Sequence, residues 1–414
     1  MTKRIQSDSP AIHSPESFPT NADSEIRNAQ EEAPEESPEN PQFQLSMKQQ
    51  GNEAAAFQDL AGKLRFMNLT QQVQNQPQNI PQPPTTLRAG PNAQPIWTPV
   101  APRFAMITDE FLKAAQAGDI ITMDYLLAKG MDINGKGTMS MTPLMVAAQS
   151  GNMKSLEYLI KNNADVNVKN IADKTAMHFA AEQDRPDVIA KLLEAGADPE
   201  IRMTFGRTPL IWAAENNSAA SIEVLVRNGA DINAVDDNGA TALMNAAGRK
   251  MGNAVNELIY RGADITKADK DGETPLMAAA EAGDRNVTAS IIGAVHSMDK
   301  KARAAFVNAQ DNKGKTALMH AAGNANKYEL KHLIRLRADL NVQDGDKKTA
   351  LMHAVEGGHL ETVRALVDAG AKIGIESKPG ETALTMAKAA LNASLASKKL
   401  QEMVKILENP PKKP

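Results

Sequence analysis

A threonine followed by Pro or Ala and then by Leu or Met recurs through the last three quarters of the chain. These threonines are Thr142, Thr175, Thr208, Thr241, Thr274, Thr316, Thr349 and Thr382, with successive gaps of 33, 33, 33, 33, 42, 33 and 33 residues. A fixed period of this size indicates one supersecondary unit that is copied and stacked, because a single copy cannot bury its own apolar face. The function of such an array has to be sought on its surfaces rather than in a cleft.

Each part of the repeated unit has a physical role. In the repeat around Thr241, Asn238-Gly239 suits a tight turn with positive φ, and Thr241 can cap a helix by accepting from a free N–H. Ala246-Ala247 permits close approach of helices, and Gly262 suits the end of a second helix. Only 4% of the residues are aromatic, so alanine and aliphatic side chains must supply the burial.

This pattern resembles the ankyrin repeat, whose signature is Asp-x-x-Gly-x-Thr-Pro-Leu-His-x-Ala-Ala, then a second helix and Gly-Ala-Asp-x-Asn. The resemblance covers residues 106–408, about nine units if the segment 109–118 is counted as an N-terminal cap. It implies a mainly α fold, an ankyrin-repeat solenoid of helix-turn-helix units with β-hairpin loops. We predict an array over 103–409, with caps at 106–134 and 376–409, and a C-terminal tail at 410–414.

Departures from the signature predict local irregularities. The glycine between the two helices becomes Lys250 and Ala325 in two repeats, and neither residue readily adopts a left-handed conformation. We therefore predict that these repeats turn differently, through Gly248 and Gly323. The 42-residue interval adds nine residues, which we place within 293–305 as a longer second helix or exit loop.

Residues 1–102 differ in composition from the array and are predicted to be largely disordered. They are rich in Ser, Pro, Glu, Asn and Gln, a composition that cannot offset its ordering entropy by burial. Within them, the segment 52–67 has helical periodicity. Its apolar stripe and adjacent basic residues are Phe57, Leu60, Ala61, Leu64, Lys63 and Arg65.

The amphipathic segment 52–67 is open to three interpretations. It can be a transient helix of a disordered tail, a recognition helix that folds on a partner, or a weak membrane-surface helix. As a recognition helix it could also dock on the concave face of its own array. Apolar and basic groups of the segment would then meet apolar and acidic groups of the repeats.

Charge and hydropathy limit the classes of partner and the locations that we expect for the protein. Residues 1–102 hold 11 of the 50 acidic and 7 of the 46 basic residues, which leaves 39 of each for the array. A neutral array lacks the electrostatic footprint of a nucleic-acid-binding protein. We predict no nucleic-acid partner, no membrane insertion and a cytoplasmic location. Export by a route that needs no cleaved apolar signal would leave the same sequence pattern.

The chain offers little catalytic or metal-binding chemistry. It contains no cysteine, and no paired-carboxylate, Ser/His/Asp or GxGxxG pattern emerges. His320 and His353 share one register in adjacent repeats, where helix spacing of roughly 8–10 Å is wide for shared ligation of a metal. We predict neither catalysis nor a cofactor nor a metal.

Positions four and seven after each threonine lie on one side of the first helix, away from the buried Leu and Ala. The resemblance assigns this side to the concave, partner-binding face. The predicted partner-binding residues are Val146, Phe179, Glu182, Trp212, Glu215, Asn245, His320 and His353, with Phe205 at a hairpin tip. We predict a non-catalytic scaffold for a protein or peptide. The alternatives are a secreted effector that binds a host protein and, less favoured, an enzyme or enzyme subunit with unrecognised chemistry.

Overall fold

The structure is a computed structural model that describes residues 101–296, 298–394 and 397–411, with side chains from residue 108 onward. Residues 1–100 of the predicted disordered region, with the predicted helix at 52–67, lie outside these residues and stay predictions. Residues 101 and 102, which the prediction places in the same region, are helical instead. Within the described part, each repeat contains two short helices and a hairpin loop, as the resemblance to ankyrin repeats implies. We name each repeat by its threonine.

The threonine of each repeat caps the first helix. Thr241 Oγ1 accepts from the backbone N–H of Met244 at 3.3 Å, which satisfies one of the free donors at the helix start. The Thr175 repeat differs, because His178 Nδ1 accepts the backbone N–H of Thr175 at 3.2 Å. Burial lowers the pKa of His178 to about 4, so this ring is neutral at ordinary pH.

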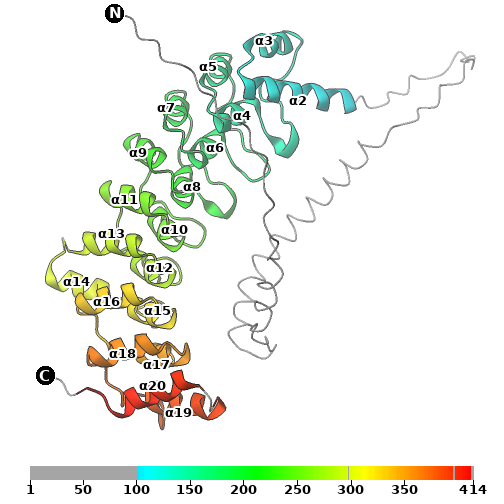
Figure 1. Cartoon of the computed structure of the whole chain (residues 1–414). Helices are drawn as coiled ribbons and strands as arrows, with labels where there is room; N and C mark the ends of the chain where they lie inside the picture. The colour runs from blue at the N-terminus through cyan, green and yellow to red at the C-terminus, as the bar shows by residue number, and fades with distance from the viewer. Residues whose placement is uncertain (1–100, 297, 395–396, 412–414) are drawn as a thin grey trace, which may run out of the picture. The chain divides into compact units, whose positions relative to one another are not determined.

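The helices form two layers that run along the array (Figure 1). The first helices are α2 (Ala101–Ala117), α4 (Pro143–Ser150), α6 (Ala176–Glu182), α8 (Pro209–Glu215), α10 (Ala242–Gly248), α12 (Pro275–Ala282), α15 (Ala317–Gly323), α17 (Ala350–Glu356) and α19 (Ala383–Ala393). The second helices are α3 (Ile120–Ala128), α5 (Met153–Lys161), α7 (Pro186–Glu194), α9 (Ala219–Arg227), α11 (Gly252–Tyr260), α13 (Arg285–Val295), α16 (Lys327–Arg335), α18 (Leu360–Asp368) and α20 (Lys398–Glu408).

The core is a continuous seam between consecutive repeats. Each first helix packs on the first helices before and after it, as α10 does on α8 and α12. Ala246 and Ala247 are fully buried there, and Leu258 of α11 closes the seam from the second layer. Small side chains allow the short helices to approach closely, so burial is shared between neighbours rather than contained in one unit.

The hairpin tips follow two designs. In most repeats an Asp or Asn five residues before the threonine closes the turn. Asp236 Oδ1, for example, accepts from the backbone N–H of Asn238 at 2.9 Å and of Ala240 at 3.0 Å. That residue is replaced by Gly137 or Met203 in two repeats, and their tips form the single turns η1 (Thr138–Ser140) and η2 (Thr204–Gly206).

Both of these turns place a large side chain in a left-handed conformation. Met139 has φ 57° and Phe205 has φ 66°, a region in which a non-glycine residue costs roughly 1–2 kcal/mol. The last hairpin is the antiparallel pair β1 (Glu376–Lys378) and β2 (Glu381–Thr382), which opens the predicted C-terminal cap.

The expectation that the repeats at 250 and 325 turn differently is wrong. Lys250 has φ 65° and Ala325 has φ 57°, so both adopt the left-handed turn, while Gly248 and Gly323 remain at the ends of α10 and α15. The backbone N–H after the turn also bonds back into the helix as elsewhere, from Met251 to Ala246 O at 2.9 Å. Packing of both helices on their neighbours fixes the turn and overrides the residue preference.

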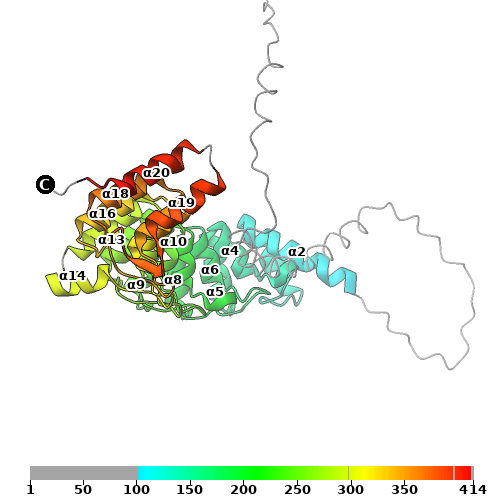
Figure 2. The same ribbon diagram turned by 90° about the horizontal axis from the view of Figure 1, so that it is seen from below.

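The nine-residue insertion forms a helix of its own. α13 has 11 residues against nine in α11, and α14 (Lys300–Val307) follows it. Phe306 and Val307 are buried, so α14 is anchored to the array at its end while it projects at the margin in both views (Figures 1 and 2). α2 begins at Ala101, five residues before the predicted start of the cap. None of the helices among the described residues is long and apolar enough to cross a bilayer.

Replacing Lys250 or Ala325 by glycine should stabilise the array. Relief of left-handed strain is worth roughly 1–2 kcal/mol, and the added chain entropy costs roughly 0.5–1 kcal/mol. We therefore expect each of Lys250→Gly and Ala325→Gly to raise the free energy of unfolding by about 0.5–1 kcal/mol in urea titrations. The control Ala289→Gly, inside α13, should lower it by a similar amount. A fall with Lys250→Gly would show that the lysine side chain itself stabilises the turn.

Candidate partner-binding surface

We define the inner surface as the residue before each threonine together with those four and seven positions after it. In three repeats the first and last of these form an ion pair that joins the residue before the threonine to the last residue of the helix. Lys174 Nζ lies 2.6 Å from Glu182 Oε2, and Arg207 Nε lies 2.7 Å from Glu215 Oε1. Lys348 and Glu356 repeat the arrangement. The basic partners were not predicted, although their spacing of eight residues from the glutamates is readable in the sequence.

Trp212 joins two repeats on the inner surface. Its Nε1 donates to Glu182 Oε2 at 3.0 Å, and Lys174 Nζ lies 4.2 Å from the centroid of its ring. The ring centroid of Phe179 lies 5.2 Å from the same Lys174 Nζ, but Phe179 is only 6% exposed. Trp212 therefore remains half-buried with its polar atom satisfied, whereas Phe179 fills the seam between repeats.

Glu215 is the most deeply buried acid of the inner surface. Its side chain is 2% exposed, and burial raises its pKa, against the opposing effect of Arg207 and Arg249. Oε2 makes no hydrogen bond and lies 3.4 Å from Arg249 Nη2, which comes from the next repeat. The carboxylate thus lies between two arginines of successive repeats, with a hydrogen bond to Arg207 only.

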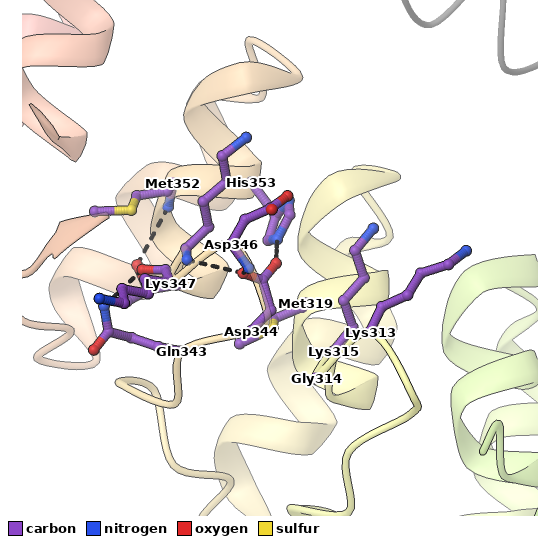
Figure 3. A network of polar contacts seen from close by, with 12 residues as sticks. Lys313, Gly314, Lys315, Met319, Gln343, Asp344, Asp346, Lys347, Met352 and His353 are labelled. Atoms are coloured by element: carbon purple, nitrogen blue, oxygen red, sulfur yellow. Dashed lines mark hydrogen bonds and ion pairs between the residues drawn. The ribbon is translucent and has the colours of Figure 1, made fainter. Parts of the chain in front are cut away.

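The polar residues at position four of the later repeats bind their own hairpins. Asn245 Nδ2 donates to Asp236 Oδ2 at 3.1 Å, and His353 Nε2 lies 2.6 Å from Asp344 Oδ2. Figure 3 shows the Asp344 carboxylate between this imidazole and the backbone of the turn at Asp346. These predicted partner-binding residues therefore fix the hairpin on the helix, with part of each side chain still accessible.

His320 has the most acidic surroundings on the inner surface. Its Nε2 lies 3.0 Å from Asp311 Oδ2 and its Nδ1 lies 3.5 Å from Glu281 Oε2. Burial alone would lower the pKa of His320, but the hydrogen bonds and charges of Glu281 and Asp311 outweigh it, and the pKa is raised. Burial, reinforced by the nearby Glu281 charge, raises the pKa of Glu273.

Ligand atoms of the kind that hold metals come together at this place. One atom from each of Glu273, Asp311 and His320 lies within 4.8 Å of the others. The His–Asp contact recurs at His353 and Asp344, where it holds a hairpin in place, so we assign the trio the same structural role. The structure brings His320 next to acids of its own and the preceding repeat, not next to His353.

The remaining predicted residues lie at two places. Val146 is half-buried on α4, and Phe205 is exposed at the tip of η2. Met139 and Ile171 are exposed at the two preceding hairpin tips but are not among the predicted residues. Their signal was an apolar residue at turn positions that hold Asn, Asp or Lys in later repeats.

The pH dependence of stability should change in a His320→Asn variant. Asn245 shows that asparagine at this position still reaches the hairpin aspartate. A raised pKa means that folded His320 contributes stability that is complete below the unfolded value of about 6.5 and is lost as pH rises through the folded value. Wild type should therefore lose stability relative to His320→Asn between pH 6 and 9 in urea titrations. The exposed-site control His296→Asn should run parallel to wild type, and a parallel course for His320→Asn would contradict the assignment.

Comparison with known protein families identifies the repeated unit. A family model described as ankyrin repeats (3 copies) matches residues 111–203, 177–269, 243–330 and 321–409, which together span most of the chain. A comparison with curated proteins gives no match. The match, the 33-residue period and the stacked pairs of helices with hairpin tips agree: the chain belongs to the ankyrin-repeat family.

Proposed function

We propose that the array is a non-catalytic scaffold that binds a protein or peptide on its inner surface, across the Thr142, Thr175 and Thr208 repeats. Ankyrin repeats are protein-interaction modules, which supports the general role. Trp212 is the observation that supports this location. It is a half-buried aromatic side chain between two repeats, and tryptophan is enriched among residues that dominate binding energy.

The side chains around Trp212 are held in place before any partner arrives. Glu182 accepts from both Lys174 and Trp212, and Glu215 binds Arg207 and faces Arg249. Association therefore costs little side-chain entropy at this place, because these rotamers are already fixed. The acids are also neutralised by neighbouring bases, so an apolar anchor of a partner would not meet an uncompensated charge there.

The two aromatic residues of the inner surface, Phe179 and Trp212, have different roles. Phe179 is buried in the seam and supports the position of Lys174. Trp212 presents the accessible aromatic surface. Phe205 is exposed at the hairpin tip of the same repeat, where Arg207 Cζ lies 5.2 Å from the centroid of its ring. A partner side chain that contacts Trp212 would therefore be bordered by apolar groups and by paired charges.

A Trp212→Ala substitution should weaken binding of peptide ligands selected from an unbiased display library with the full-length chain. We expect about 30-fold weaker binding by calorimetry, the loss of a single binding hot spot. Trp212→Phe should retain part of the affinity, because it keeps an apolar ring and loses only the hydrogen bond to Glu182.

Tyr260→Ala provides the matched control, because Tyr260 is 79% exposed at the end of the second-layer helix α11. It should bind as tightly as wild type. Circular dichroism and the urea midpoint of each variant separate loss of binding from loss of fold. Wild-type affinity of a folded Trp212→Ala variant, or a library that yields no ligand at all, would contradict the proposed function.

A further inference from the structure

The first three hairpin tips carry a row of exposed apolar side chains. Met139 is 46% exposed, Ile171 is 59% exposed and Phe205 is 55% exposed. At the positions of Met139 and Phe205 the next tips carry polar residues, namely Asn238, Asp271, Lys313 and Asp346. We call Met139, Ile171 and Phe205 the apolar row.

The members of the apolar row lie on neighbouring tips that are hydrogen-bonded to one another. The backbone N–H of Ile171 donates to Met139 O at 3.4 Å, and that of Thr204 donates to Ala172 O at 3.1 Å. Thr204 Oγ1 also donates to Ala172 O, at 2.9 Å. The three side chains are therefore held one repeat apart along the array.

A row of basic residues runs beside it. Lys136, Lys169 and Arg202 each lie six residues before the threonine of their repeat, and later repeats have Val, Ala, Gln, Gln and Glu there. Lys136 Nζ donates to Lys169 O at 3.0 Å, and Lys169 Nζ donates to Arg202 O at 2.9 Å. Neutral carbonyls fix the two lysine side chains without cancelling their charge. We call these three residues the basic row.

Net positive charge is concentrated at the same three tips. Segments 135–141, 168–174 and 201–207 contain five cations and one anion, whereas 234–240, 267–273, 309–315 and 342–348 contain six cations and eight anions. Two of the five cations, Lys174 and Arg207, are paired with glutamates of the inner surface. The basic row supplies the rest, with Asp173 3.8 Å from Lys169 Nζ.

Two members of the apolar row adopt a left-handed backbone conformation that their residue types disfavour. Met139 and Phe205 have positive φ, where asparagine or glycine would be unstrained. Their exposed side chains do not repay this strain by burial in the array. Strain retained at an exposed apolar residue points to a role in contact with another molecule.

We propose that the apolar and basic rows bind an acidic segment of a protein partner in the polyproline II conformation, with an apolar side chain at every third position. Packed helices, and hence successive tips, lie roughly 8–10 Å apart. A polyproline II segment has three residues per turn and advances about 9 Å in that distance, so every third side chain meets the next tip. Acidic residues between them face the basic row. This proposal rests on the proposed function and extends the contact to the tips.

The single-file arrangement favours a peptide over an anionic membrane. Both rows follow the tips of three repeats and end where Asp237 and Asn238 begin the next tip. An extended chain matches such a line, whereas a membrane surface binds a broad basic and apolar face. Adsorption to vesicles is therefore an alternative outcome that the experiment has to separate.

The test measures binding of a designed peptide to the full-length protein by calorimetry. The peptide is about twelve residues long, with Phe or Leu at every third position and Glu or Pro between, to favour polyproline II. Two control peptides carry Lys in place of Glu, or the same composition with the apolar residues out of period. We expect both controls to bind at least tenfold more weakly, and binding of the designed peptide to weaken in roughly 0.5 M salt.

Substitutions at the tips should weaken peptide binding without lowering the stability of the array. Met139→Asn with Phe205→Asn should weaken peptide binding at least tenfold while the urea midpoint stays level or rises, because asparagine tolerates positive φ. Lys136→Glu with Lys169→Glu should weaken it as well. Tyr260→Asn and Lys331→Glu, at exposed second-layer positions, should leave binding unchanged. A structural role of the apolar row would instead lower the midpoint.

Three results would overturn the proposal. The first is equal binding of the designed and control peptides, and the second is unchanged binding of the designed peptide by the tip variants. The third is co-sedimentation of the protein with phosphatidylcholine–phosphatidylserine vesicles that the designed peptide does not reduce. Ligands from the unbiased library separate this proposal from the function on which it rests. Library ligands whose binding depends on Trp212 but not on either row would support the scaffold function and contradict only the proposed binding of an acidic peptide at the tips.

Discussion

The packing of each first helix on the first helices of its neighbours is the interaction on which the rest of the structure depends. A single repeat has two short helices and too little apolar surface to fold alone, so the seam between repeats is the core. Alanine at the seam, as at Ala246 and Ala247, lets the helices approach closely. The same packing dictates the turn between helices, which explains why Lys250 and Ala325 adopt a left-handed conformation that glycine would take more readily.

The inner surface contributes to the stability of the array and is also where we propose that a partner binds. Asn245, His320 and His353 fasten hairpin aspartates, and Glu182 and Glu215 hold basic residues of their own and adjacent repeats. Such contacts fix the surface in one arrangement, which lowers the entropy lost on binding. They also mean that substitution of these residues would disturb the array itself. Trp212 differs because part of its ring stays accessible while its Nε1 is satisfied.

The polarity and charge of the hairpin tips change along the array. The first three hairpin tips combine exposed apolar residues with excess positive charge, whereas the following tips are polar and slightly acidic. In two of these three tips, Gly137 and Met203 replace the Asp or Asn that closes most of the other turns. Without that side chain the tip turns through two left-handed residues, of which the first is Met139 or Phe205.

The sequence by itself determined the period, the threonine caps, the two helices of each repeat and the alanine seam, because these depend on local propensity and on spacing along the chain. It also identified the side of the first helices on which the candidate residues lie. Tertiary structure decided which of those residues remain accessible. Phe179 and Trp212 occupy the same position in adjacent repeats, yet one is buried and the other half-buried, since exposure depends on the neighbours that stacking provides. The row of Met139, Ile171 and Phe205 likewise exists only after stacking, because residues about 33 apart in sequence become neighbours when successive tips are hydrogen-bonded.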